Sequence, residues 1–101
     1  MIGGIAVVAE ALRLAGALGL DPDTARTALA NGPLGAVVAR AFAGGVHFDT
    51  ALAVKDLELA VKTTRLPAVE AALAQYRDVC ADPALAHADL ARAVAHLIAR
   101  D

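Results

Sequence analysis

The first eighteen residues carry a repeating pattern of apolar positions. Apolar side chains recur at three- and four-residue steps, at Ile2, Ile5, Val8, Ala9, Leu12 and Ala15. Because such steps place side chains on one face of a helix, we expect a helix over residues 1–18 that is stopped by Gly19. The pattern starts in apolar sequence without a capping residue, so we also expect that an upstream part of this helix is missing from the chain.

Capping and breaking residues divide the rest of the chain into further helices. Asp21-Pro22-Asp23 offers an N-cap, a first-turn proline and a negative charge where a second helix starts. Asp49 or Thr50 is the expected cap of the fourth helix. Breaks are expected at Asn31-Gly32-Pro33, Gly44-Gly45, Leu66-Pro67 and Asp82-Pro83. The helices expected after the first therefore cover residues 22–30, 35–43, 50–64, 68–80 and 89–100.

Two of these later helices show the same one-faced pattern. The apolar stripe of the first is formed by Leu73, Tyr76 and Val79. The stripe of the second is formed by Leu90, Val94, Leu97 and Ile98. No segment alternates apolar and polar residues as a half-buried strand does. We therefore expect an all-α fold, a compact bundle of five to six helices in which residues 1–101 form a single domain.

The composition suggests that this bundle has a partner. The sequence is 58% hydrophobic and 20% charged, with one Tyr, two Phe and no Trp. So many aliphatic residues are more than 101 residues can easily bury, and an exposed apolar surface marks an interaction site. We expect that surface to be covered by a second subunit, in a homodimer, or by a missing domain.

Charge and cysteine content narrow the class of protein. The net charge of −2 opposes nucleic-acid binding, and if residues 21–43 formed a helix-turn-helix, its recognition helix, the third of the chain, would offer only Arg40 to read bases. The apolar start is interrupted by Glu10 and Arg13 and has no basic residues before it, so neither a membrane span nor a signal peptide is expected. The single cysteine, Cys80, cannot form an internal disulfide, which favours a cytoplasmic setting.

Residues 48–60 form the most unusual segment. On a helix, Leu52, Lys55, Asp56 and Leu59 share one face, while Val54, Leu57 and Val61 form a second apolar stripe. Since a helix that is apolar on two sides is normally buried, Lys55 and Asp56 are expected at the edge of a core, where charges are costly unless paired or functional. Alternatively, both charges extend to water, or Lys55 pairs with Glu58 or Asp56. Glu58 and Lys62 are expected to form a surface pair.

The order and spacing of four segments resemble the C-terminal helical domain of the β-hydroxyacid dehydrogenases. This family includes 3-hydroxyisobutyrate, tartronate semialdehyde and 6-phosphogluconate-like dehydrogenases and the related imine reductases. The resemblance covers nearly the whole chain, although each motif is common by itself. The segments are Ala9-Glu10-Ala11-Leu12, Leu18-Gly19-Leu20-Asp21, Phe48 with Lys55-Asp56-Leu57 following it, and Asp89.

The resemblance implies a fold of the 6-phosphogluconate dehydrogenase C-terminal type and specific site residues. Phe48 would line the substrate and nicotinamide region, Lys55 would lie near the cofactor, and Asp56 would orient nearby groups. The family's catalytic lysine, followed by two residues and an asparagine, would lie upstream of Met1. The family enzymes bind NAD or NADP through an N-terminal Rossmann domain and dimerise through the helical domain.

Some features of the chain depart from this family or offer no chemistry. The family's Gly-Val-Pro-type loop is reduced to Arg65-Leu66-Pro67, and the stretch before Asp89 lacks glycine. Gly3-Gly4 and Gly44-Gly45 lack the strand and spacing of a dinucleotide-binding fingerprint. No metal site is expected, and Cys80 has only Arg77 nearby to activate its thiol. The histidines considered for a metal site are His47, His87 and His96, which are scattered without ligand spacing.

Two functions remain open on the sequence. In the first, the chain is the substrate and dimerisation domain of an NAD(P)-dependent 3-hydroxyacid dehydrogenase, inactive alone and without a cofactor of its own, since the Rossmann domain and the proton-transferring lysine are absent. In the second, it is a stand-alone, non-catalytic helical module that dimerises through its first and last helices.

Overall fold

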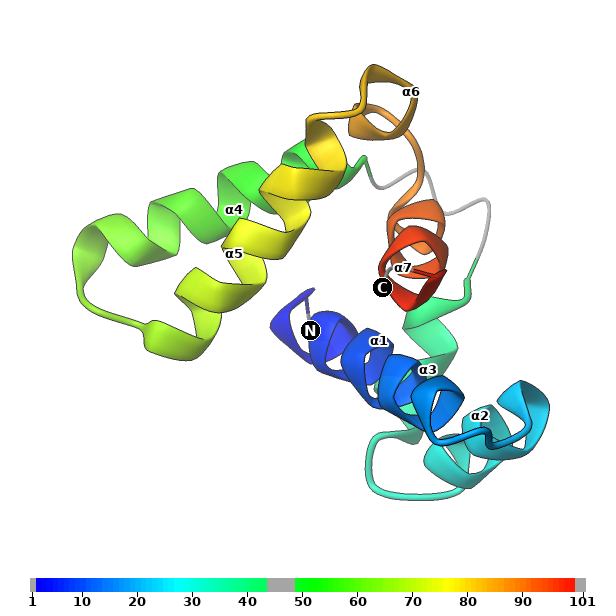
Figure 1. Cartoon of the computed structure of the whole chain (residues 1–101). Helices are drawn as coiled ribbons and strands as arrows, with labels where there is room; N and C mark the ends of the chain where they lie inside the picture. Colours follow the sequence, from blue (N-terminus) through cyan, green and yellow to red (C-terminus); the bar gives the residue numbers. More distant parts are fainter. Residues whose placement is uncertain (1, 44–48, 100–101) are drawn as a thin grey trace.

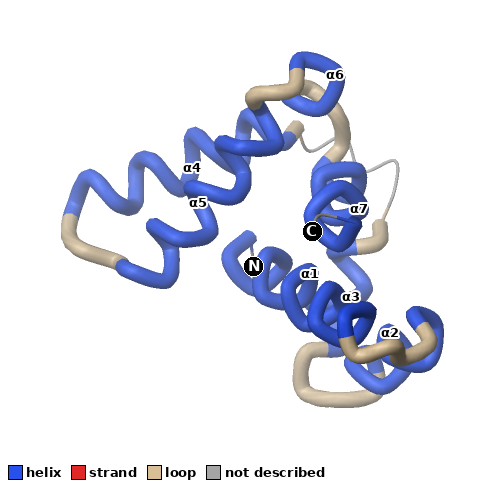
Figure 2. The backbone as a smooth tube through the Cα atoms, viewed as in Figure 1, coloured by secondary structure: helices blue, strands red, loops and turns tan. Residues whose placement is uncertain are grey.

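The computed structural model describes residues 2–43 and 49–99, and within them all regular structure is helical (Figure 2). The predicted all-α class is confirmed. The described residues form seven helices rather than five to six, because Pro83 starts an additional single turn after the break at Asp82. The helices are α1 Ile2–Ala17, α2 Pro22–Ala30, α3 Gly35–Ala41, α4 Thr50–Thr63, α5 Pro67–Cys80, α6 Pro83–Ala86 and α7 Leu90–Ala99.

Local chemistry explains where α1 ends and α2 begins. Gly19 adopts a φ of 77°, a left-handed conformation that glycine reaches without steric cost, and this stops α1. Asp21 is the N-cap of α2, as predicted, and its Oδ2 accepts a hydrogen bond of 2.9 Å from the Thr24 backbone N–H and one of 3.0 Å from the Thr24 hydroxyl. These bonds stabilise the carboxylate and hold the pKa of Asp21 below its ordinary value of 3.8.

The helices are arranged around α1 (Figure 1). Helix α1 packs against α7, α3, α2 and α5, while α4 and α5 form an antiparallel pair joined by a short turn. The start of α4 is tied to the start of α7, because the Thr50 N–H donates to the Ala88 carbonyl at 3.1 Å and Asp49 and Asp89 form an isolated antiparallel bridge. The result is a compact globule from which the α4–α5 turn extends.

The predicted apolar stripes form the core. The stripe of α1 is buried from Ile5 to Leu12, and the stripes of α5 and α7 meet it. Tyr76 has no exposed surface, and its hydroxyl donates a 2.8 Å hydrogen bond to the Ile2 carbonyl, which joins α5 to the first turn of α1. Several of the other core positions are alanines, which let the helices approach closely: Ala6, Ala9, Ala41, Ala53, Ala72 and Ala93.

Candidate functional site on helix α4

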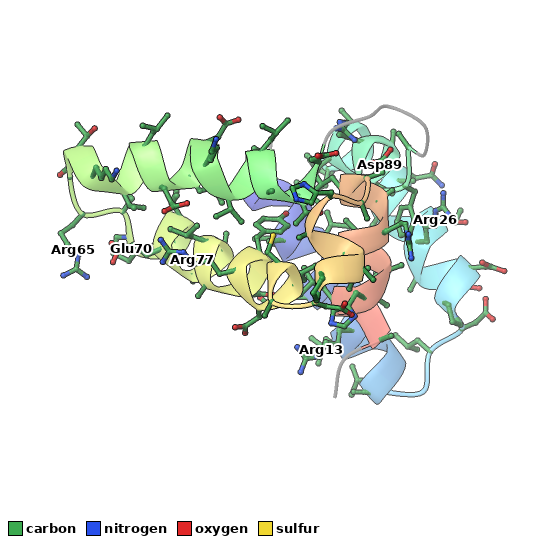
Figure 3. The ribbon with its side chains drawn as sticks, turned by 90° about the horizontal axis from the view of Figure 1, so that it is seen from above. Arg13, Arg26, Arg65, Glu70, Arg77 and Asp89 are labelled. Carbon is green, nitrogen blue, oxygen red and sulfur yellow. The ribbon has the colours of Figure 1, made fainter. Side chains whose placement is uncertain are left out.

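Helix α4 was expected to be buried on both sides, and this prediction is wrong. Ala53 and Leu57 are buried against the core. On the opposite side, Leu52 is 47% exposed and Leu59 is 65% exposed. The reason is that α4 packs against α5, α6 and α7 on one side only, and Figure 3 shows its other side chains extending away from α5. We call Leu52, Lys55, Asp56 and Leu59 the outer face of α4.

Lys55 and Asp56 both lie in solvent on this outer face. They are therefore not at the edge of a core, and the alternative in which both reach water describes their position. Lys55 lines a shallow depression of about 390 Å³ together with Glu58, Leu59 and Lys62. This depression provides a cationic surface beside an exposed leucine, a combination suited to contact with an anionic group or with another protein surface.

Glu58 has a different partner from the predicted one. Its Oε2 lies 3.2 Å from the Arg77 Nη2, so it joins α4 to α5. No ion pair between Glu58 and Lys62 or Lys55 is present among the described residues. Glu58 and Arg77 are 19 residues apart and lie on different helices, so the three- or four-residue spacing of helical neighbours could not have indicated this pair.

The start of α4 contains a second contact that the sequence did not predict. The Oδ2 of Asp49 lies 3.4 Å from the Nδ1 of His87, so Asp49 faces the turn between α6 and α7. Asp49 occupies the N-cap position of α4, as predicted, but its side chain makes no capping hydrogen bond. Phe48 and His47, which precede it, lie outside the described residues. The structure therefore brings Lys55 and Asp56 together on one helix and leaves the third predicted site residue undescribed.

Cys80, the single cysteine of the chain, is half-buried. Burial raises the pKa of the Cys80 thiol, which disfavours the reactive thiolate. Within residues 2–43 and 49–99, no three His, Cys, Asp or Glu side chains are grouped so that they could hold a metal ion. In the same part of the chain, no helix combines the length and apolar character needed to cross a membrane.

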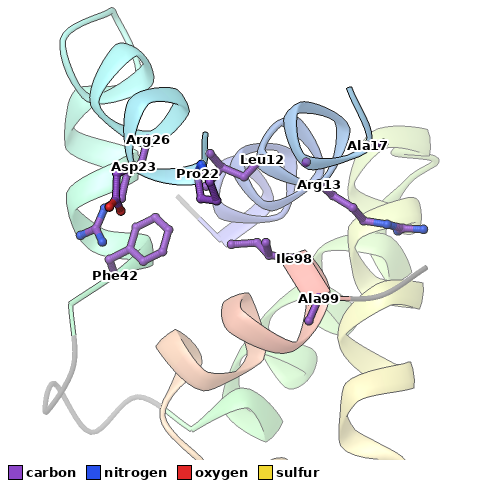
Figure 4. A pocket seen from close by; sticks show the side chains of 10 residues that line it. Leu12, Arg13, Ala17, Pro22, Asp23, Arg26, Phe42, Ile98 and Ala99 are labelled. Atoms are coloured by element: carbon purple, nitrogen blue, oxygen red, sulfur yellow. The ribbon is translucent and has the colours of Figure 1, made fainter. Parts of the chain in front are cut away.

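A second candidate site is a groove formed by residues outside α4, which the sequence did not predict. It lies between α1, α2, α3 and α7, has a volume of about 600 Å³ and is shown in Figure 4. Its apolar surface comes mainly from Leu12, Ala17, Pro22, Phe42 and Ile98. These residues lie on α1, α2 and α7 and at the C-cap of α3, so no local spacing could have brought them together.

Comparisons of this chain with protein-family models, with curated proteins and with solved structures find no match. A functional assignment therefore depends on the chain's own residues and on their arrangement.

Proposed function

We propose that the chain is the C-terminal substrate and dimerisation domain of an NAD(P)-dependent 3-hydroxyacid dehydrogenase, with the corresponding 6-phosphogluconate dehydrogenase-like helical fold. The support is the resemblance of the α1, α4 and α7 motifs to that family, together with the outer face of α4. The single observation that carries the proposal is that Lys55 lies in solvent between two exposed leucines, Leu52 and Leu59. An exposed apolar patch rimmed by polar residues marks an interaction surface, and in this proposal another domain covers it.

Each residue of the outer face has a role in this proposal. The Lys55 ammonium would hold an anionic group of substrate or cofactor by charge attraction, and no acidic side chain of the described residues competes for it in an ion pair. Leu52 and Leu59 would pack against the Rossmann domain and exclude water around Lys55. Asp56 would orient neighbouring donors, and Phe48 would line the nicotinamide region. Bound NAD(P) would supply the hydride-transfer chemistry.

The proposal assigns no catalytic residue to this chain. The lysine that moves the hydroxyl proton and the Rossmann domain that binds NAD or NADP would belong to polypeptide outside these 101 residues. The chain alone is therefore expected to show no turnover of a short 3-hydroxy acid with NAD(P).

The first test is the coding DNA immediately upstream of Met1. We expect an in-frame domain with a Gly-rich dinucleotide fingerprint that ends in a Lys–x–x–Asn motif. A stop codon directly upstream, or an upstream domain without this fingerprint, would contradict the proposal.

The second test uses the full-length protein that this reading frame would encode. Lys55→Ala should lower kcat/KM for NAD(P)-dependent oxidation of 3-hydroxyisobutyrate by about tenfold or more, because it removes a charge that contacts the reacting complex. Arg92→Ala, which removes an exposed cation of α7 away from this depression, is the control and should stay within about twofold. Equal effects of the two substitutions would remove Lys55 from the site.

The alternative is a stand-alone, non-catalytic dimerisation module, and a different observation favours it. The end of α1 and the turn after it expose Leu14, Leu18 and Leu20 by 62%, 68% and 56%. If this apolar cluster forms a homodimer, sedimentation should give a dimer for the unmodified chain and a monomer for Leu18→Glu. A monomer for the unmodified chain at all concentrations would exclude this function.

A further inference from the structure

The groove of Figure 4 has the size and the wall of a small-molecule site. Its volume of about 600 Å³ falls within the range of about 300–1,000 Å³ that is usual for ligand pockets. Leu12 and Ile98 lie along its centre, contributed by α1 and α7. None of the lining residues belongs to the outer face of α4, so the groove is independent of the function proposed above.

The charged groups of the groove favour an anion. Two arginines, Arg13 and Arg26, line it on opposite sides of the apolar centre, and Asp23 is the acidic residue among its lining residues (Figure 4). Neither arginine takes part in an ion pair with the described residues. Two cations facing one carboxylate leave a positive balance beside an apolar surface.

Arg26 is also held in place before any ligand arrives. Its guanidinium carbon lies 3.8 Å from the centre of the Phe42 ring, a cation–π contact between α2 and the C-cap of α3. A cation–π contact uses the charge of the guanidinium and not its N–H donors, so these donors can still form two parallel hydrogen bonds with a carboxylate. Holding the arginine in this way reduces the conformational entropy that is lost on binding.

We propose that this groove binds a small amphiphilic carboxylate of the medium-chain fatty acid class. The carboxylate lies against the edge of the Arg26 guanidinium, and the hydrocarbon chain lies along Leu12 and Ile98 toward Arg13. An apolar cation is disfavoured, because Arg26 already covers one face of Phe42.

The test is calorimetric titration of the chain with hexanoate, octanoate and decanoate below their micelle concentrations. Full burial of one methylene strengthens binding by roughly fourfold. Because the groove is open on one side, the hydrocarbon chain is only partly buried. We therefore expect the affinity to rise by about three- to tenfold for each two carbons added to the ligand. Decanol and decyltrimethylammonium, which share the chain and lack the carboxylate, should bind at least about tenfold more weakly than decanoate.

Four substitutions localise the binding. Arg26→Gln should weaken decanoate binding by about tenfold, whereas Arg92→Gln, on the exposed side of α7, should leave it unchanged. Gly16→Leu should abolish binding by filling the groove, and Gly3→Leu should not, since Gly3 lies on α1 outside it. A Cβ meets no atom within 4 Å at either glycine, and leucine favours helix more than glycine does, so both variants should fold.

Several results would overturn this proposal. One is the absence of decanoate binding to the unmodified chain, and another is binding that neither Gly16→Leu nor Arg26→Gln changes. If decanol binds as tightly as decanoate, Arg26 has no part in recognition. If Gly16→Leu instead converts a dimer to a monomer in sedimentation while decanoate does not bind, the groove is occupied by a second copy. Turnover measurements on Lys55 variants are unaffected by any of these outcomes, so this test can fail without the proposed function failing.

Discussion

Tyr76→Phe removes one buried oxygen atom and should change the stability of the protein in a pH-dependent way. The Tyr76 side chain has no exposed surface, and its hydroxyl donates to the Ile2 carbonyl at 2.8 Å. Loss of this hydrogen bond should lower the free energy of unfolding by about 1 kcal/mol near neutral pH, since the ring still fills its place in the core. The difference should appear as a lower urea midpoint with an unchanged slope.

At alkaline pH the sign of this difference should reverse. Burial raises the pKa of the Tyr76 hydroxyl well above its ordinary value of 10.0, because the phenolate would lose its hydration. Above about pH 10 the unfolded chain therefore releases a proton that the folded chain retains, and the stability of the unmodified protein falls by up to about 1.4 kcal/mol per pH unit. Phenylalanine has no such proton. The two stability curves should cross between about pH 10.5 and 11.

Urea unfolding followed by circular dichroism from pH 7 to 11.5 measures both curves. Every other titrating group is common to the two proteins, so their difference isolates Tyr76. Because the chain has one tyrosine and no tryptophan, absorbance at 295 nm reports ionisation of Tyr76 without interference. Parallel curves over the whole pH range, or a tyrosine that ionises near pH 10 in the folded protein, would refute this account of the buried hydroxyl.

Three further predictions concern glycines, the core and the surface, and urea unfolding at neutral pH checks all of them. Gly19→Ala should destabilise the fold by about 1–2 kcal/mol, because the residue has a φ of 77°. Gly16→Ala, inside α1, should stabilise it by about 0.5–1 kcal/mol. A change of the same sign for both substitutions would contradict the backbone conformations of these glycines. Leu90→Ala should cost about 2–5 kcal/mol, since Leu90 is 1% exposed, and a cost under 1 kcal/mol would place α7 outside the core. Leu59→Ala should change the stability by less than about 0.5 kcal/mol, and a larger loss would mean that the outer face of α4 is covered.

The helices and their buried stripes could be predicted because a single period determines them. The residues from Ile5 to Leu12 share a face of α1 whatever else the chain does, and the same holds for the stripe through Tyr76. The dipeptide Asp82-Pro83 predicted the end of one helix but not the start of the next. Proline ends the helix before it and suits the first turn of the next one, so the same dipeptide that was expected only as a break also begins α6.

The sequence left two positions open for the charges of the outer face of α4, at the edge of a core or in water, and could not decide between them for a physical reason. A stripe of leucines shows that a helix has an apolar face, but burial depends on which elements reach that face. Leu57 and Leu59 lie two residues apart and have similar side chains, yet one is buried and the other is 65% exposed. Contacts between distant segments are equally hidden in the sequence, as the Arg26–Phe42 pair and the groove beside it show.

The apolar excess of the chain is explained by how its side-chain sizes are distributed. Alanines occupy many core positions, so the helices pack closely around a small interior and some leucines remain outside. Helix α4 and the end of α1 lie on opposite sides of the molecule (Figure 1), and both carry exposed leucines. A single flat contact would not reach both. A domain packed on α4 and a second subunit packed on the end of α1 would cover them separately, which is why the domain contact and the dimer contact are tested with different variants, Lys55→Ala and Leu18→Glu.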